Sequence, residues 1–340
     1  MKALKISIDK FRIIAAILII AIHIFPFASI NETVDFVFTH VICRIGVPFF
    51  FMVTGYFVLP KAIEDKNKLI KYTLKIIKIY AICILIYLPI NLYAGQLNNI
   101  TIIEAIKNIC INGTFYHLWY FPAVILGIWV TYFFIKHLNK TSSIISIVIL
   151  YIIGIFGDSY FGISKQSIII SKTYDAIFMI ADYTRNGLFF APIFISLGYS
   201  FNNMKNKISQ NKSAIFAIIS MFFMIFEGII LKHFNLQKHD SMYFMLVPTM
   251  FFIFNILVQI NNENNKKLRN IATIIYIMHP MFIIFIRGVA KVISLENIMI
   301  NNSLINYILV ATSTLIFSIL FENIKEKIVK KKNHKIERVM

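Results

Sequence analysis

Two histidines lie inside apolar stretches that are long enough to cross a membrane. In the run FRIIAAILIIAIHIFP, a helix would place the imidazole of His23 ~16 Å above Arg12. His279 lies about nine residues inside a later apolar run, which corresponds to a depth of ~13 Å. Ionisable side chains at such depths are rare, usually face the interior of a bundle, and mark functional sites. Because free imidazole has a pKa of about 6.5, it is suited to removing a proton from a hydroxyl group.

Three further ionisable residues interrupt apolar stretches, namely Arg44, Glu227 and Arg287. Arg44 would lie ~12 Å deep from the opposite side, where it could pair with a carboxylate or with a substrate. Together with His23 and His279 it predicts a polar chamber, in which Arg44 or His279 would stabilise a developing oxyanion. The competing interpretation is that each histidine only joins two helices through a hydrogen bond.

Aromatic residues gather where the predicted fourth span begins, in the sequence YHLWYF. His117 and Trp119 in this stretch would lie where an external acceptor enters, although an interfacial aromatic belt has the same composition. The predicted external segment 157–186 is the longest and carries Arg185 among acidic and aromatic residues. Long segments of this kind often carry function, so we predict that these three side chains contact substrate.

The elements that must position these residues are membrane helices. The 340 residues are 58% hydrophobic and only 15% charged, with a mean hydropathy of +0.74. Runs near the ~20 residues needed to cross a bilayer recur throughout. We therefore predict an all-α, polytopic transmembrane bundle of ten spans, at residues 13–30, 36–59, 72–94, 118–135, 142–157, 187–201, 213–232, 241–260, 270–290 and 303–322.

The distribution of charge predicts how these spans are oriented. The chain carries a net charge of +18. Most of its 34 lysines and arginines fall in terminal segments and loops that would lie on the same side of the membrane as the N-terminus. By the positive-inside rule both termini are cytoplasmic in the cell membrane, and membrane topology rather than nucleic-acid binding explains the charge. We expect one membrane domain over residues 1–324 and a basic tail over residues 325–340.

The three cysteines have neither paired spacing nor neighbouring histidines. They predict no disulfide and no metal site.

Several motifs resemble the integral-membrane acyltransferase-3 family over essentially the whole chain. The similarity lies in Arg12 with His23, in GVPFFFMVTGYF at 46–57, in YHLWYFPAVILGIW at 116–129 and in YIMHPMF at 276–282. It implies that His23 is the catalytic histidine, that Arg12 is the arginine of the first-helix motif and that His279 is the histidine of the last motif. Thr54 and Gly55 match the family's Ser-Gly pair. Pro48 stands where many members carry an acidic residue.

Within this family, FYHLWYFPA, IGIFGDSYFG and DYTRNGLFFAPIFISLGY most resemble the N-terminal membrane half of vancomycin-resistance-type membrane serine/alanine racemases. In those proteins a pyridoxal-phosphate racemase domain follows on the cytoplasmic side. Because this sequence stops at Met340, we expect the racemase domain to be absent here.

The resemblance leads to hypotheses from different classes. The first is acyl transfer, in which Arg12 and the 61–78 loop hold acyl-CoA and no cofactor is tightly bound. His23 would then act on a hydroxyl group of an envelope carbohydrate, either as a base or through a covalent intermediate. The second is L-serine uptake, with Arg44 or Arg287 holding the carboxylate and Glu227 the amine. The third is a non-catalytic partner of a separate racemase.

Overall fold

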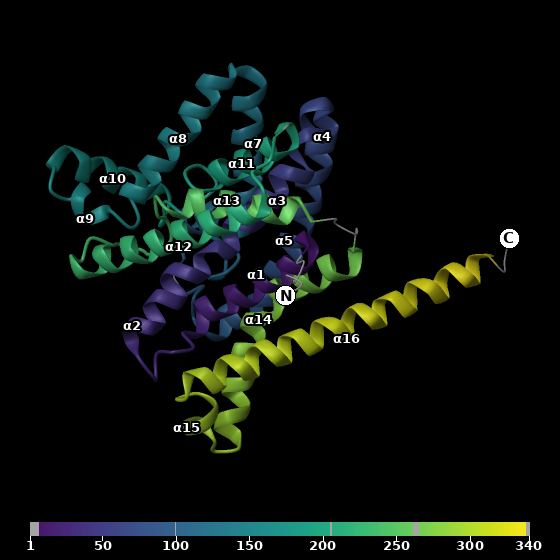
Figure 1. Cartoon of the computed structure of the whole chain (residues 1–340). Coiled ribbons are helices and arrows are strands. Elements are labelled where there is room, and N and C mark those ends of the chain that lie inside the picture. Colours follow the sequence, from purple (N-terminus) through teal and green to yellow (C-terminus); the bar gives the residue numbers. More distant parts are fainter. Residues whose placement is uncertain (1–6, 99, 205, 261–264, 338–340) are drawn as a thin grey trace. The chain divides into compact units, whose positions relative to one another are not determined.

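In the computed structural model the described residues, 7–98, 100–204, 206–260 and 265–337, form helices and no strands (Figure 1). The chain divides into two compact units. One unit combines the N-terminal segment up to Gly46 with the segment from Ile260 onward, and the other is Val47–Gln259. The predicted all-α class is confirmed.

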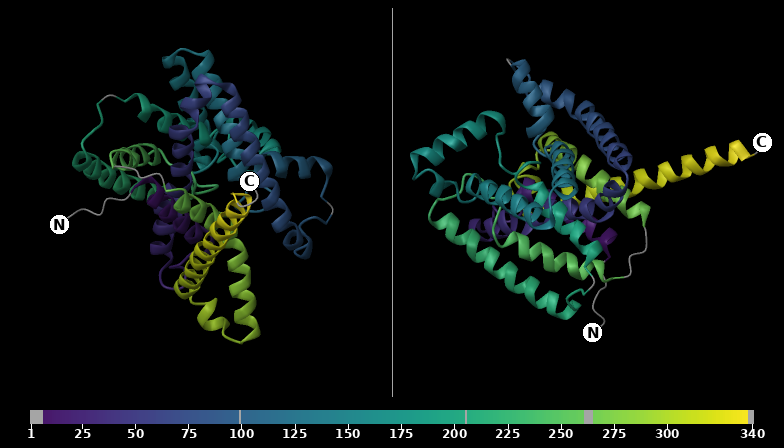
Figure 2. Two further views of the ribbon diagram at one scale, coloured as in Figure 1. Left: turned by 90° about the vertical axis from the view of Figure 1, so that its right-hand side faces the viewer. Right: turned by 90° about the horizontal axis from the view of Figure 1, so that it is seen from above.

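The first unit is built on three helices that pack against one another, α1 (Ile8–Ile24), α14 (Lys266–Val292) and α16 (Ser303–Glu337). Their shared core consists mainly of isoleucine. α16 runs beside α14 and then continues past its end (Figure 2). The unit also contains α2 (Glu32–Asp35), the π-helix η1 (Phe36–Val41), the 3₁₀-helix η2 (Ile42–Ile45) and α15 (Glu296–Met299).

Local signals at its two ends determine the extent of α1. The side chain of Ser7 accepts a hydrogen bond from the backbone of Lys10, which caps the N-terminus. At the other end Phe25 adopts the left-handed conformation, with φ of 59°, and Pro26 has no N–H with which to continue the helix. The helix therefore begins and ends earlier than the predicted span 13–30.

The second unit contains the remaining helices. It begins with α3 (Gly46–Phe57), which starts at the boundary between the units. The others are α4 (Leu59–Glu64), α5 (Lys66–Tyr93), α6 (Ile102–Lys107), the π-helix η3 (Asn108–Asn112), α7 (Tyr120–His137), α8 (Lys140–Phe156), α9 (Phe161–Ser164), α10 (Ile168–Ile180), α11 (Ala191–Asn203), α12 (Gln210–His233) and α13 (Leu246–Val258).

Two glycines let α3 and α11 cross at close range. A Cβ atom added to Gly55 would collide with the carbonyl group of Ile195, and one added to Gly198 would collide with that of Met52. Small residues at helix crossings are typical of membrane bundles because they let the backbones approach. The TG pair in the predicted second span is therefore explained by packing at Gly55.

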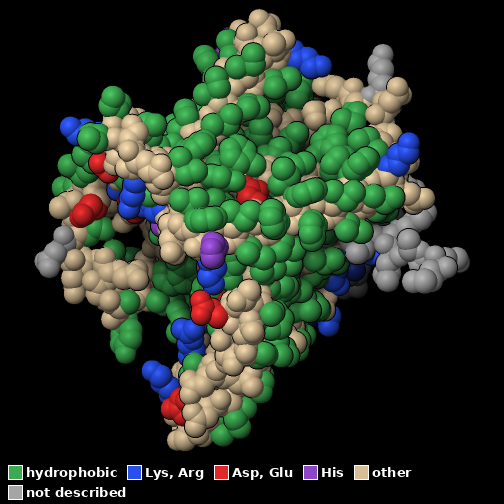
Figure 3. Space-filling view, turned by 60° about the vertical axis from the view of Figure 1, so that its left-hand side comes forward, with side chains coloured by type: hydrophobic (Ala, Val, Ile, Leu, Met, Phe, Trp, Pro, Cys, Tyr) green, Lys and Arg blue, Asp and Glu red, His purple; other side chains and the backbone are tan. Residues whose placement is uncertain are grey.

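Among the described residues, six helical segments are long and apolar enough to cross a membrane, at 32–57, 66–93, 120–137, 210–233, 266–292 and 303–331. The ten predicted windows all contain a helix, but α11 and α13 have only 13 residues each, fewer than the ~20 that a span needs. Hydrophobic side chains cover much of the face in Figure 3. A helical membrane protein is thus confirmed, whereas the count of ten spans, the cytoplasmic termini and the domain boundary at residue 324 stay predictions.

Candidate functional site

The side chains of His23 and His279 lie together in the first unit. Their ring centroids are 5.3 Å apart and the rings are inclined by 20°, so they are stacked. His23 is in the last turn of α1 and is half-buried, whereas His279 is fully buried in the middle of α14. The two histidines, which are predicted to lie at a similar depth, are in direct ring contact, whereas their depth in a membrane and their chemical roles stay predictions.

The backbone of α14 determines which nitrogen of His279 carries the proton. Nδ1 lies 2.9 Å from the carbonyl oxygen of Tyr276 and 3.3 Å from that of Ile275. Because carbonyl oxygens only accept hydrogen bonds, we assign the proton to Nδ1. The lone pair therefore belongs to Nε2, the nitrogen on the other side of the ring.

Arg44 lies in η2, an element that packs against α1. Its guanidinium is 3.4 Å from Nδ1 of His40, whose ring stacks on Phe25 and Phe36. Among the described residues no carboxylate pairs with Arg44, and its buried Nε has no hydrogen-bond partner. Arg44 is predicted to pair either with a carboxylate or with a substrate. The described part of the chain supplies no such carboxylate, and the pairing with a substrate stays a prediction.

A second polar cluster lies at the N-terminal ends of α1 and α14. Asp9 is only 6% exposed, and its Oδ1 accepts a hydrogen bond from Nε of Arg12 at 3.1 Å. Its Oδ2 lies 3.4 Å from Nη1 of Arg269 and accepts a hydrogen bond from the backbone N–H of Asn265 at 2.9 Å. Two guanidinium groups thus share one carboxylate, and the three charged side chains carry a net charge of +1.

Sequence reasoning found Arg12 but missed Asp9, Arg269 and His40. Asp9 precedes Arg12 by three positions, a spacing at which helical side chains meet, so a local signal for this ion pair was present. Arg269 joins the cluster from a helix far along the chain. No pattern in a single sequence indicates that contact.

The predicted external residues lie in the second unit. His117 is 1% exposed and packs against Tyr87, Phe115 and Tyr116, with ring centroids 4.9 to 5.7 Å away. Its surroundings are aromatic, as the YHLWYF stretch indicates. Its predicted contact with substrate stays a prediction.

Arg185 lies against two aromatic rings, 4.3 Å from Tyr183 and 5.2 Å from Trp119. Such cation–π contacts contribute ~0.5–2 kcal/mol each, depending on burial. Nη1 of Arg185 is also 3.5 Å from Oγ of Ser241 in the loop between α12 and α13. The structure therefore brings together Trp119 and Arg185, two of the three residues predicted to contact substrate, and that role stays a prediction.

Glu227 projects from α12 into the same loop. One carboxylate oxygen accepts hydrogen bonds from the Tyr160 hydroxyl at 2.9 Å and from the backbone N–H of Phe244 at 2.8 Å, and the other accepts one from the N–H of Met245 at 2.9 Å. Buried Asp158 binds the neighbouring N–H groups in a similar way. These contacts hold the loop in place.

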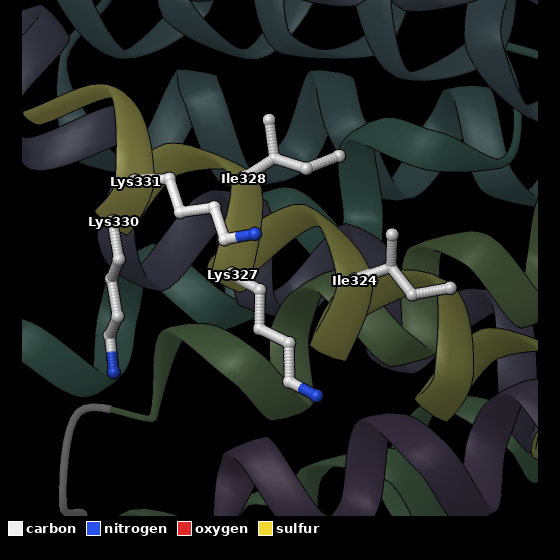
Figure 4. Close-up of a pocket in the computed structure, with 5 residues that line it drawn as sticks. All are labelled: Ile324, Lys327, Ile328, Lys330 and Lys331. Atoms are coloured by element: carbon white, nitrogen blue, oxygen red, sulfur yellow. The ribbon is translucent and has the colours of Figure 1, made fainter. Parts of the chain in front are cut away.

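Arg287 and the C-terminal lysines lie apart from the histidine pair along their helices. Arg287 is exposed near the end of α14. A hollow of about 310 Å³ lies along α16 and is lined by two isoleucines and three lysines of that helix alone (Figure 4). The five residues are Ile324, Lys327, Ile328, Lys330 and Lys331. Since a single helix supplies every lining side chain, this is a surface groove on the basic tail.

The described residues contain no group of three or more His, Cys, Asp or Glu side chains that could hold a metal ion. With its apolar helices and a histidine pair between two of them, the chain has the features of a polytopic membrane protein with an internal polar site. The sequence model of the acyltransferase-3 family, described as an acyltransferase domain, matches residues 5–323. The chain therefore belongs to this family.

Three curated relatives resemble this chain over nearly its whole length. Two amino-acid racemases of Enterococcus faecalis are 37% and 36% identical to it over 330 and 337 residues, which is 96% and 95% of this chain and 46% of each relative. A serine/alanine racemase of Enterococcus gallinarum is 33% identical over 322 residues, or 93% of this chain and 45% of the relative. The chain thus spans less than half the length of these relatives. No solved structure matches it.

Proposed function

We propose that this protein is a membrane acyltransferase that moves an acyl group, such as acetyl, from cytoplasmic acyl-CoA to a hydroxyl group of an extracytoplasmic acceptor. The observation that carries the proposal is the arrangement along α1 and α14. Each helix has an arginine near its N-terminus, Arg12 or Arg269, and a histidine ~15 Å further on. The arginines meet at Asp9 and the histidines meet ring to ring.

The two clusters would divide the work between donor binding and chemistry. The net positive charge at Asp9 suits the phosphates of acyl-CoA, because guanidinium groups bind phosphate oxygens through paired N–H groups. Placed on the cytoplasmic side, as the predicted topology has it, this cluster would hold the donor while its acyl end reaches the histidines. An envelope carbohydrate is the acceptor class that we favour.

His23, which is partly accessible, would take the proton from the acceptor hydroxyl as its oxygen attacks the thioester carbonyl. A tetrahedral oxyanion then forms, and the buried Nε–H of Arg44 is a donor suited to stabilise it. Collapse of this intermediate breaks the carbon–sulfur bond, the proton passes to the CoA thiolate, and the products are the acyl ester and CoA. A covalent acyl-histidine would give the same products in two steps.

The test follows transfer from radiolabelled acetyl-CoA to envelope carbohydrate in membranes. We expect the His23→Ala variant to lose about 100-fold or more of the rate, as is typical when a general base is removed. A matched control is His233→Ala, which removes an exposed histidine at the end of α12. An unchanged rate in His23→Ala membranes that contain normal amounts of protein would disprove the assignment.

A second function is favoured by the racemases that align with this chain, one of which is named for serine and alanine. In this alternative the chain takes up L-serine, and Arg44 with its unpartnered Nε binds the carboxylate. Uptake of radiolabelled L-serine into proteoliposomes without acyl-CoA would support it. Co-purification of a separate racemase with a chain that neither transfers nor transports would instead support a role as a non-catalytic partner.

A further inference from the structure

A hollow of about 360 Å³ lies in the second unit and is lined by residues of α9, of α10 and of the loop after α12. Figure 1 labels these three helices. Its lining includes the lysines Lys165 and Lys238, the rings of Phe161 and Phe178, and Asp175. None of these residues belongs to the histidine pair or to the Asp9 cluster. In the predicted topology this part of the chain faces outward.

The backbone around this hollow is held by hydrogen bonds between segments. The N–H of Gly162 donates to the carbonyl oxygen of Leu236 at 2.6 Å, and the N–H of Lys238 donates to that of Asp158 at 3.0 Å. A Cβ atom on Gly162 would lie 2.8 Å from Cα of Leu236, so only glycine permits this approach. The two lysines are therefore carried by segments that are fixed to each other.

The ammonium groups of these lysines rest on aromatic rings instead of pairing with acids. Nζ of Lys238 is 3.0 Å from the centroid of Phe178 and 5.1 Å from that of Phe161, and Nζ of Lys165 is 5.0 Å from Phe161. Within the described residues neither ammonium forms an ion pair with a carboxylate. By contrast, nearby Lys107 is paired with Asp182 at 2.6 Å.

This arrangement leaves a surplus of positive charge at a place where space is available. Two lysines and the single carboxylate of Asp175 give the lining a net charge of +1. Burial and repulsion by the charge of Lys165 lower the pKa of Lys238, although the charges of Asp175 and Asp182 partly offset them. An anion between them would relieve that repulsion, and the phenylalanine rings would pack against the apolar part of the molecule that carries it.

We propose that this hollow binds an oxyanion group, a phosphate or a carboxylate, carried by the acceptor of acyl transfer. The volume is within the range of small-molecule sites and is about ten times the ~30 Å³ that one water occupies, so it suits a charged sugar unit. Lysines act as point charges and do not distinguish the two oxyanions by shape. The link to the acceptor rests on the proposed function, whereas binding itself does not.

The experiment uses mass spectrometry to measure how fast individual lysines are acetylated by a trace of an amine-reactive acetylating reagent. It uses the full, unmodified chain in nanodiscs of phosphatidylcholine, with glycerol 3-phosphate or galacturonate as the soluble probes and acetyl-CoA omitted. We expect labelling of Lys165 and Lys238 to fall about tenfold at a probe concentration ten times its Kd. Lys172, which is exposed on α10 and does not line the hollow, is the matched control.

Each outcome decides the proposal. Equal labelling of Lys165 and Lys238 with and without the probes, or equal protection of Lys172, overturns it. Protection only in nanodiscs that contain phosphatidylglycerol also overturns it, because the oxyanion would then be a lipid headgroup. Protection by the soluble probes in a chain that shows no acetyl transfer would retain the anion site and reject the transferase.

Discussion

In the first unit the central polar side chains, His23 and His279, face each other from two helices, whereas in the second unit the carboxylates of Asp158 and Glu227 face backbone N–H groups of one loop. The carboxylate of Asp158 satisfies N–H groups of buried residues, and that of Glu227 satisfies N–H groups of the exposed residues that follow them. His279 uses Nδ1 for its bonds to the backbone, and its Nε2 carries the lone pair.

The comparison shows that a polar residue near an apolar span has one of two uses, and that its hydrogen-bond partners distinguish them. A side chain whose acceptors are taken up by backbone donors stabilises the fold. A side chain that retains a basic nitrogen or a charged donor after its structural bonds are counted can act on a substrate. The first kind should affect stability when it is changed, and the second kind should affect activity.

The largest effect is expected for Asp158→Ala. Oδ1 of this buried carboxylate accepts hydrogen bonds from the N–H groups of Ser241 at 2.7 Å and Met242 at 3.0 Å. Leaving both donors unsatisfied costs ~1–3 kcal/mol each, so the free energy of unfolding should fall by ~2–6 kcal/mol. Thermal unfolding of the purified protein measures this change.

The control for Asp158 is Asp175→Asn, which removes an exposed carboxylate and should leave the unfolding midpoint nearly unchanged. Asp158→Asn retains an acceptor oxygen and should be intermediate if the alanine variant does not accumulate. Equal midpoints for Asp158→Ala and the unmodified protein would break the distinction between the two units.

The next effect is expected for His279→Gln. Glutamine retains an N–H donor for the Tyr276 carbonyl but lacks the ring that stacks on His23, the proposed base, so the fold should persist while transfer from acetyl-CoA falls by about 100-fold, as is typical when a catalytic group is misplaced. Rate and unfolding midpoint are measured on the same preparation. A lower midpoint with an unchanged rate would place His279 with the structural residues of the second unit.

The sequence predicts the helices well because length and hydropathy decide them, and each of the ten apolar windows holds a helix. It also predicts the level of His23 and His279, since depth along a helix follows from counting residues. It does not predict which faces of the helices meet. Asp9 and Arg269 are 260 positions apart, and the bond of Glu227 to Tyr160 joins α12 to a loop 67 positions earlier.

A smaller effect is expected for Arg269→Gln. Without this guanidinium, the single carboxylate of Asp9 faces only the guanidinium of Arg12. The two charges cancel, so the cluster loses its net positive charge. Loss of a charged hydrogen bond is worth ~1.5–3 kcal/mol, and 1.4 kcal/mol corresponds to a factor of ten, so the KM for acyl-CoA should rise about tenfold or more. The value of kcat should change little, because Arg269 lies ~15 Å along α14 from His279.

The matched control for Arg269 is Lys267→Gln on the same turn of α14. It removes the same charge from a partly exposed lysine that pairs with Glu326 at 3.6 Å. We expect its KM for acyl-CoA to stay within about twofold of normal, as for most surface charges. If both variants raised the KM equally, the effect would come from the general potential of the surface and not from a site at Asp9.

The smallest effect concerns the reactivity of Lys238 in the second unit. Burial lowers its pKa, the charge of Lys165 lowers it further, and Asp175 and Asp182 raise it. A lowered pKa means that more of the amine is neutral at any pH below that pKa, so Lys238 should be acetylated faster than exposed Lys172. A change of one pKa unit alters the neutral fraction of the amine tenfold. A neighbouring charge that shifts the pKa by less than one unit therefore changes the acetylation rate by less than about tenfold.

Two substitutions should move this rate in opposite directions. Lys165→Gln removes a repelling charge, raises the pKa of Lys238 and slows its acetylation. Asp175→Asn removes an attracting charge, lowers the pKa and speeds the reaction. The measurement is the rate of Lys238 labelling against pH in each variant, with Lys172 in the same sample as reference. If both substitutions moved the rate in the same direction, altered exposure rather than charge would govern Lys238, and the electrostatic description of the hollow would fail.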